Sequence, residues 1–193
     1  SCFLDFKCSW DTCFWTRNKK RIHDKIGKRT NYHSRTSHRY YHWLYYRTYN
    51  PAQMNILILQ GPNLNLLGLQ SANIQKRLTL DKLNKAIKLH VRSKDIHLKF
   101  FQSHKEFQAI NFIQRNRNWA DGLLFIPTTW ALNNFTLLET IKIINIKTSL
   151  ILFEEPFSFG VSKEKSILNA ENILTFLGTP IETCLKGLDH ILS

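Results

Sequence analysis

MNILILQGPNLNLLG, residues 54–68, is the stretch of this 193-residue chain that most narrows its fold. It opens with a short apolar run, residues 55–60, which breaks at Gly61-Pro62. A short apolar run that ends in such a pair is typical of a buried parallel strand. Met54 is the only methionine of the chain and directly precedes this strand. We therefore expect Met54 to be a translation start, with the folded domain beginning there.

Further apolar runs alternate with helix-length segments along the rest of the chain. The expected strands span residues 96–103, 123–127, 149–153 and 173–178, and the expected helices span residues 79–93, 106–118, 132–144 and 180–191. Thr79 suits the N-cap of the first helix, and Pro180 suits the first turn of the last.

Helical periodicity predicts which side chains of these helices face the core. In the first helix, one face should carry apolar residues at helical spacing: Leu80, Leu83, Ile87 and Val91. In the second helix, we expect Phe107, Ile110 and Ile113 to share a buried face.

The alternation of strands and helices predicts an α/β fold. Right-handed crossovers turn this pattern into a flavodoxin-like, doubly wound, five-stranded parallel sheet with helices on both faces. Ligands of such sheets bind at the carboxyl ends of the strands. We therefore expect Gly61-Pro62-Asn63 at that edge, together with the residues that follow Ser103, Pro127 and Phe153.

Residues 1–53 differ in composition from the rest of the chain. They contain eleven Lys or Arg against three Asp or Glu, a net charge of +8, whereas residues 54–193 carry +5 of the total of +13. All six tyrosines lie in this segment, and no period of 2 or 3.6 persists along it. We expect it to be a basic extension unrelated to the domain at 54–193, either disordered or upstream non-coding sequence that has been translated.

Two functional interpretations of this extension are weaker. Residues 19–29 are rich in Lys and Arg, and in residues 38–49 basic side chains are interleaved with aromatic ones. Both features would suit an arm that binds nucleic acid. The spacing of four potential metal ligands does not match a paired zinc knuckle: Cys8, Cys13, His23 and His33. We therefore predict neither a nucleic-acid partner nor a metal site.

The composition also bears on the compartment. No segment reaches the roughly 18–20 apolar residues of a membrane span, and no apolar region typical of a signal peptide follows the first charges. Residues 54–193 hold a single cysteine, Cys184, which argues against a disulfide framework. The sequence predicts no membrane partner and a reducing compartment, either the cytoplasm or the stroma or matrix of an organelle.

Several motifs follow GPNLNLLG in a characteristic order. They are TL at 79–80, FFQS at 100–103, DGLLFIP at 121–127 and a last strand that ends at Gly178. In this order they resemble the type II 3-dehydroquinate dehydratases over essentially all of residues 54–193. The resemblance implies the dehydration of 3-dehydroquinate, a small-molecule acid, to 3-dehydroshikimate in the shikimate pathway. It also implies that no cofactor is needed and that the subunits form a dodecamer built from trimers.

The reaction of that family is an elimination through an enolate. A tyrosinate beside an arginine removes a proton, the asparagine of the GPN motif holds a water against the enolate, and a histidine protonates the leaving hydroxyl. A second asparagine, a Glu-x-His element, backbone amides and another arginine bind the substrate. The chemistry therefore depends on a base, a proton donor and a cation at defined positions.

Most catalytic positions of the family carry a different residue type here. The GPN asparagine is retained as Asn63, and Asn65 follows the family pattern. The loop arginine falls on Gln70, the tyrosine base on Gln75 and the acid histidine on Leu132. Neither glutamine nor leucine can perform these proton transfers, and losing a general acid or base costs roughly 10²–10⁴-fold in rate.

The substrate-binding positions have changed as well. The family segment Asn-Pro-Gly-Ala-Tyr-Thr-His becomes Ile-Pro-Thr-Thr-Trp-Ala-Leu at residues 126–132, which places Ile126 at the binding asparagine. The Glu-x-His element falls on Leu152-Phe153-Glu154. An acidic residue that the family places at a subunit contact is retained as Glu139.

These substitutions leave three interpretations of the chain. The first is a 3-dehydroquinate dehydratase by descent whose activity is weak or absent. The second is a non-catalytic homologue that serves as a structural subunit, with a basic surface available to an acidic partner. The third is a decaying reading frame. Surrogate groups exist in His104, Lys76 and Arg77, but a strand-end polar residue and solvated loop charges explain these three better.

Overall fold

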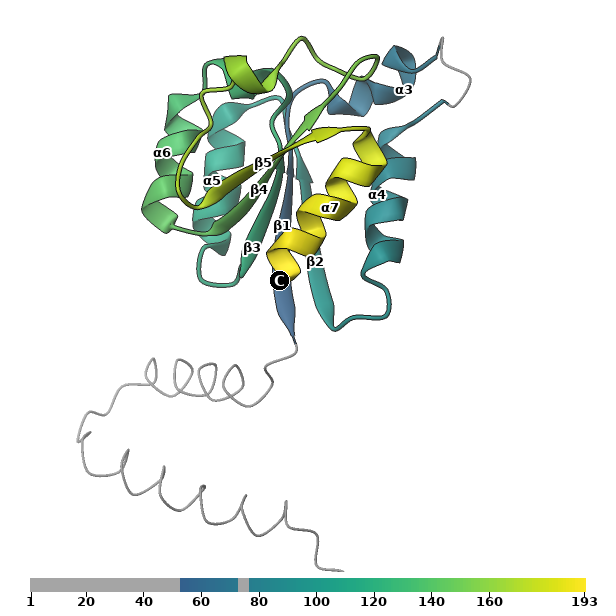
Figure 1. Ribbon diagram of the computed structural model, residues 1–193. Coiled ribbons are helices and arrows are strands. Elements are labelled where there is room, and N and C mark those ends of the chain that lie inside the picture. Colours follow the sequence, from purple (N-terminus) through teal and green to yellow (C-terminus); the bar gives the residue numbers. More distant parts are fainter. Residues whose placement is uncertain (1–52, 73–76) are drawn as a thin grey trace, which may run out of the picture. The chain divides into compact units, whose positions relative to one another are not determined.

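The computed structural model describes residues 53–72 and 77–193 (Figure 1). The expectations for residues 1–52, Gln75 and Lys76 lie outside the described residues. The strands are β1 (Met54–Gln60), β2 (Ile96–Gln102), β3 (Gly122–Ile126), β4 (Lys147–Phe153) and β5 (Ile173–Gly178). The longer helices are α4 (Leu80–His90), α5 (Glu106–Asn116), α6 (Phe135–Ile144) and α7 (Pro180–Leu192). The short helical segments are η1 (Leu64–Leu66), α3 (Leu67–Gln70), η2 (Thr128–Leu132) and η3 (Lys163–Lys165).

The strands form one parallel sheet in the order β2-β1-β3-β4-β5. This is the flavodoxin-like order of doubly wound sheets. The fold class predicted from the sequence is therefore confirmed. Each of the five strands lies within two residues of its expected limits.

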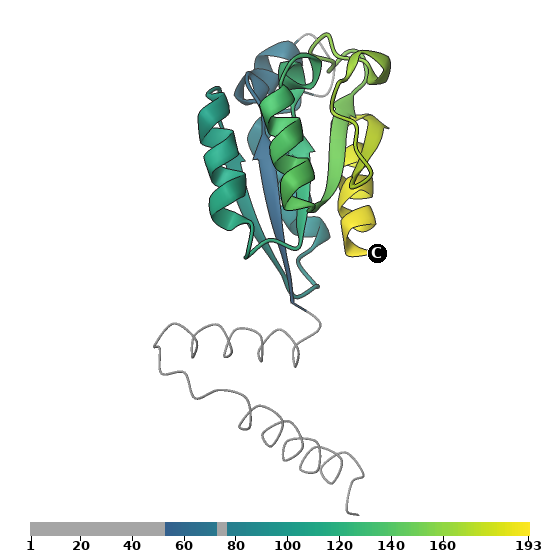
Figure 2. The same ribbon diagram turned by 90° about the vertical axis from the view of Figure 1, so that its left-hand side faces the viewer.

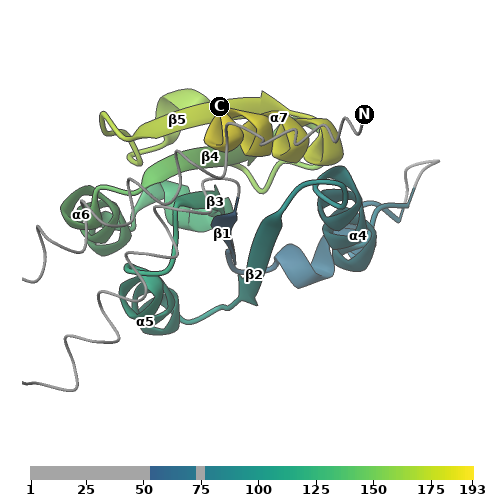
Figure 3. The same ribbon diagram turned by 90° about the horizontal axis from the view of Figure 1, so that it is seen from below.

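The helices α5 and α6 cover one face of the sheet, and α4 and α7 cover the other (Figures 2 and 3). Leu57 and Leu59 of β1 pack into the core beneath α5 and α6, whereas Ile56 and Ile58 pack into the core beneath α4 and α7. This division follows from the strand, because successive side chains point to opposite faces. Within the described ranges, no helix is long and apolar enough to cross a membrane.

The helix starts at Thr79 and Pro180 follow from their chemistry. The backbone N–H of Lys82 donates to Thr79 Oγ1 at 3.3 Å, which confirms the predicted N-cap of α4. Leu83 and Ile87 of that helix are fully buried, as expected. Pro180 is the first residue of α7, where its missing N–H costs nothing.

Two expectations about the middle helices are wrong. Phe107 is 60% exposed, and Ala109 and Ile113 are the buried residues of α5. A helix turns about 100° per residue, so Phe107 lies about 120° around the axis from Ile113. The helix expected from residue 132 instead begins at Phe135, because the side chain of Asn134 accepts the N–H of Leu137 at 3.0 Å and caps it there.

Candidate functional site

The carboxyl ends of β1 and β3 approach each other closely at Gly61. Its N–H donates to the Ile126 carbonyl oxygen at 2.8 Å, and Thr128 Oγ1 donates to the Pro62 carbonyl oxygen at 2.8 Å. A Cβ added at Gly61 would lie 2.2 Å from the Pro127 carbonyl oxygen. Glycine is therefore required here by the approach of two backbones.

Asn63 follows β1 at this edge, as the sequence predicted. Its φ of 62° is left-handed, a conformation that asparagine tolerates better than most residues, and its side chain is exposed. The Asn63 N–H donates to His104 Nδ1 at 3.3 Å. In the neutral imidazole, this bond leaves the proton of His104 on Nε2. The contact thus joins the ends of β1 and β2.

Thr128 has a backbone conformation that is unusual for its type. Its φ is 50°, in the left-handed region, and its side chain is buried. Such a conformation costs a β-branched residue on the order of 1–3 kcal/mol. In the resemblance described above, residue 128 takes the place of the glycine of the segment 126–132. Glycine would adopt this φ without strain.

Gln70 ends α3 and is tied to a distant loop. Its Nε2 donates to the Ser158 carbonyl oxygen at 2.6 Å. Its Oε1 is buried and has no hydrogen-bond partner in the part of the chain that the structure describes. The Gln70 side chain therefore holds α3 against the loop that follows β4. Gln75, expected at the family's tyrosine position, lies outside the described residues.

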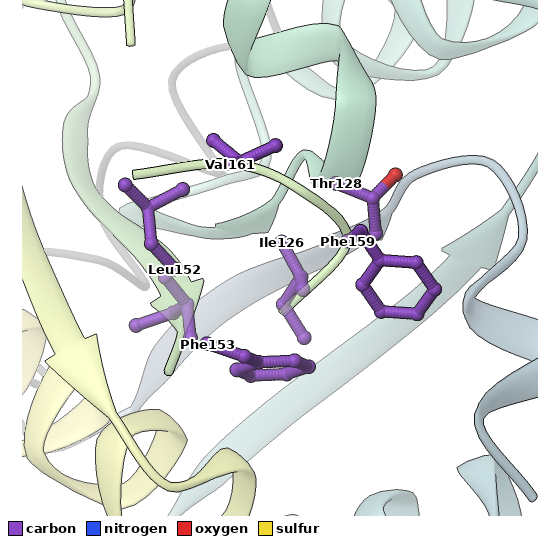
Figure 4. Close-up of a pocket in the computed structure, with 7 residues that line it drawn as sticks. Ile126, Thr128, Leu152, Phe153, Phe159 and Val161 are labelled. Carbon is purple, nitrogen blue, oxygen red and sulfur yellow. The ribbon is translucent and has the colours of Figure 1, made fainter. Parts of the chain in front are cut away.

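A small cavity brings Ile126 and Leu152 together, two residues that the sequence analysis expected at substrate-binding positions (Figure 4). Its volume is about 10 Å³, and its lining is apolar except for one threonine: Ile126, Thr128, Ile151, Leu152, Phe153, Phe159 and Val161. A cavity of that size holds at most about one water molecule. Leu132 does not line this cavity and is 36% exposed.

Phe159 and Val161 were not anticipated from the sequence. Both lie in the loop between β4 and η3, and their side chains line the cavity together with Ile126 (Figure 4). An irregular loop carries no period from which buried positions can be read. Only their apolar character could have drawn attention to them.

Glu154, expected at the histidine of the Glu-x-His element, and Glu139, expected at a subunit contact, are both exposed. Glu154 follows β4, where its N–H donates to the Gly178 carbonyl oxygen at 3.0 Å. Glu139 lies on α6 and lines a shallow hollow of about 490 Å³ together with Phe135, Lys142 and Ile143. Glu139 is therefore separate from the apolar cavity.

Two other titratable groups have perturbed pKa values. Burial raises the pKa of the Cys184 thiol, and Cys184 is completely buried in α7. Burial and the charge of Lys147 lower the pKa of His190, whose Nδ1 lies 3.3 Å from Ser149 Oγ. Neither residue lines the cavity. Across residues 53–72 and 77–193, no group of three or more His, Cys, Asp or Glu residues could hold a metal ion.

Comparison with known proteins gives a consistent result. The family model described as dehydroquinase class II matches residues 54–190. A protein of Clostridium botulinum (strain Loch Maree / Type A3) named 3-dehydroquinate dehydratase is 35% identical over 139 residues, 72% of this chain and 95% of that protein. A protein of Dictyoglomus turgidum with the same name is 32% identical over 109 residues, 54% of this chain and 75% of that protein.

Solved structures show the same fold. The type II dehydroquinase of Butyrivibrio crossotus superimposes with a TM-score of 0.64 at 23% identity and covers 73% of this chain and 99% of its own. The type II dehydroquinase of Propionibacterium acnes superimposes with a TM-score of 0.61 at 19% identity and covers 72% and 98%.

Proposed function

Since this chain belongs to the class II dehydroquinase family, we propose that it is a divergent 3-dehydroquinate dehydratase whose activity is weak or lost. The reaction is the dehydration of 3-dehydroquinate, from which the relatives of this chain take their name.

The cavity at Ile126 and Leu152 is the observation that carries this proposal. Its volume of about 10 Å³ leaves no room for a ring-shaped carboxylic acid. If Phe159 and Val161 moved aside, the exposed walls would still be apolar, and a carboxylate desolvated against them would lack a compensating partner. Weak substrate binding follows from both arguments.

The residue types at the family's proton-transfer positions support the same proposal. Gln75 and Leu132 cannot take up or donate the protons that the elimination requires. His104 is the nearest available substitute, because its Nδ1 already contacts the backbone of Asn63. In that arrangement Nε2 of His104 could donate a proton. A base would still be missing, because residue 75, expected at the position of the tyrosine base, is glutamine.

The direct test is an absorbance assay of 3-dehydroshikimate formation, with the Clostridium botulinum relative as the positive control. Loss of both a base and an acid should lower the rate by roughly 10⁴-fold or more. Turnover at a rate comparable with the control would contradict the proposal. In that case His104→Ala would show whether His104 acts as the substitute.

Substrate binding provides an independent test by isothermal titration with 3-dehydroquinate. We expect little heat, and we expect Asn63→Ala to change the result little. Micromolar binding that disappears in Asn63→Ala would mean that a working ligand site survives around this residue.

A second candidate function, a structural subunit of a homo-oligomer, is favoured by the outer face of α6. Phe135 is 68% exposed and Ile143 is 76% exposed, on either side of the hollow that Glu139 and Lys142 also line. Burying such residues against another subunit would stabilise an assembly. A two-fold contact could pair Glu139 of one copy with Lys142 of the next, since such interfaces are self-complementary.

Sedimentation velocity tests this second function through the mass of the full chain in solution. Ile143→Glu should shift the protein toward the monomer, because it places a charge in the buried contact. Leu89→Glu is the matched control, since Leu89 is 55% exposed on α4, against the other face of the sheet. A monomeric parent protein, or equal effects of the two variants, would argue against an interface at α6.

A further inference from the structure

The charge of residues 54–193 is concentrated in one part of the fold. Residues 80–117, which include α4, β2 and α5, contain nine Lys or Arg against three Asp or Glu. The remainder of residues 54–193 contains seven against eight. The net positive charge therefore comes entirely from the segment that surrounds β2.

β2 is an edge strand with an open hydrogen-bonding side (Figure 3). Among the described residues it pairs with β1 alone. The Met54 N–H donates to the Asp95 carbonyl oxygen, and the Ser103 N–H donates to the Gln60 carbonyl oxygen. Backbone groups of a parallel strand alternate in direction, so those of Leu98 and Phe100 point away from β1. An open row of this kind is a template for another strand.

Lysine side chains lie on both sides of this open edge. On the α5 side, Lys99 Nζ lies 3.7 Å from the centre of the Trp119 ring and donates to Asn116 Oδ1 at 3.0 Å. On the α4 side, Lys88 Nζ lies 5.1 Å from the centre of the Phe100 ring. Neither lysine forms an ion pair with a residue in the described ranges. The aromatic contacts hold both ammonium groups beside the strand.

We propose that the open edge of β2 binds an extended, acidic polypeptide segment of a partner protein as an additional strand. Main-chain pairing to Leu98 and Phe100 would supply the register, and carboxylates would face Lys88 and Lys99. Charge decides among the possible occupants. Residues 1–53 of the same chain carry +8, and a second copy of β2 would bring the same lysines into opposition, so both are repelled.

The hydrogen-bonding pattern of a β-strand distinguishes an acidic peptide from a nucleic acid as the occupant of this edge. A phosphate backbone could meet the lysines, but it cannot continue the alternating N–H and C=O pattern of a strand. Binding by peptide pairing must therefore change the amides of β2, whereas binding by charge alone need not.

The test uses the full chain and a fluorescein-labelled peptide of seven residues, the length of β2, in which glutamate alternates with valine. Fluorescence anisotropy should show saturable binding. A matched peptide, with alternate backbone nitrogens methylated on the pairing side, keeps every charge and should bind at least tenfold more weakly. An oligodeoxythymidine of equal net charge should also bind at least tenfold more weakly than the unmodified peptide.

Amide hydrogen exchange locates the bound peptide. The amides of Leu98 and Phe100 should gain at least tenfold protection, and those of His97 and Lys99, which already face β1, should change little. The double variant Lys88→Glu/Lys99→Glu should weaken binding at least tenfold. The control Lys163→Glu/Lys165→Glu makes the same charge change in η3 and should have little effect on affinity.

Three results would overturn the proposal. The peptide could fail to bind at millimolar concentration, the methylated peptide or the oligonucleotide could bind as tightly as the unmodified peptide, or protection could appear elsewhere than β2. Each of these measurements is made on the unaltered protein, so the conclusion does not depend on the folding of a variant. None of them depends on whether the protein dehydrates 3-dehydroquinate.

Discussion

Replacing Gly61 with alanine tests the close approach of β1 and β3 on which the geometry of the candidate site depends. The added Cβ would lie 2.2 Å from the Pro127 carbonyl oxygen and 2.6 Å from its carbonyl carbon. Ordinary contacts begin at 3.4 Å, so the two segments must separate by about 1.2 Å. The obstacle is backbone, which cannot rotate away as the end of a side chain can.

The cost follows from what this separation disturbs. Overpacking of a well-packed site costs about 1–3 kcal/mol. Weakening the bonds from the Gly61 N–H to Ile126 and from Thr128 Oγ1 to Pro62 adds about 1 kcal/mol for each bond lost. Part of each loss will be relieved by relaxation. We therefore expect the free energy of unfolding to fall by about 3 kcal/mol, which corresponds to a Tm lower by about 10 °C.

Urea unfolding of the full chain, followed by circular dichroism, measures this loss. The midpoint concentration should fall by about 1.5 M for a slope near 2 kcal/mol/M. Gly68→Ala is the matched control. Its Cβ would lie 3.1 Å from Thr79 Cγ2, the end of a side chain, and alanine favours the helix by about 1 kcal/mol. We expect the control to change stability by less than about 1 kcal/mol.

A Gly61→Ala protein that unfolds at the parental midpoint would refute this reasoning. It would mean that the Gly61 backbone does not lie against Pro127 in solution. A large loss in both variants would instead show that the region from 61 to 68 tolerates no added methyl group, so that Gly61 has no special place.

Three further outcomes follow from residues of α7. Gly187→Ala should destabilise the protein by about 1–2 kcal/mol in urea unfolding, because its Cβ would lie 2.6 Å from Ile151 Cδ1; an unchanged midpoint would contradict that packing. The pKa of His190 is lowered by burial and Lys147, so its contribution to stability is present above the ordinary value of 6.5 and is lost as pH falls through the lowered pKa. His190→Asn should therefore flatten the decline of the urea midpoint as the pH falls below about 6.5, and an unaltered decline would assign it to other groups. The Cys184 thiol, buried and with a raised pKa, should be alkylated by iodoacetamide only in urea, as mass spectrometry of its peptide would show; equal labelling in buffer would be incompatible with its burial.

Much of the architecture could be predicted because its signals are local. The apolar run before Gly61 specified a buried strand, and the Thr79 hydroxyl specified a helix start. Periodicity was less reliable on α5, where a step of three residues drifts around the helix and placed Phe107 on the wrong face. At Asn134 a side-chain cap prevailed over the apolar pattern that predicted an earlier start.

The residue types of the candidate site could be read from the sequence, but its geometry could not. That Gln70, Ile126 and Leu132 replace functional residues of the family stays a prediction. That Ile126 and Leu152 share one cavity, while Leu132 lies outside it, could not be read in the same way. The distances between these three side chains depend on the order of strands in the sheet and on the path of each loop that connects them.

The sequence by itself thus determined the strands, the helix starts at Thr79 and Pro180 and the parallel fold, since each depends on neighbouring residues or on residue type. Only the tertiary structure decided that Asn63 contacts His104, that Gln70 is bonded to Ser158 and that Phe159 lines the cavity. The first two contacts span 41 and 88 residues. No local pattern encodes such pairs, because they form only when the sheet brings the ends of its strands to one edge and the loops pack over them.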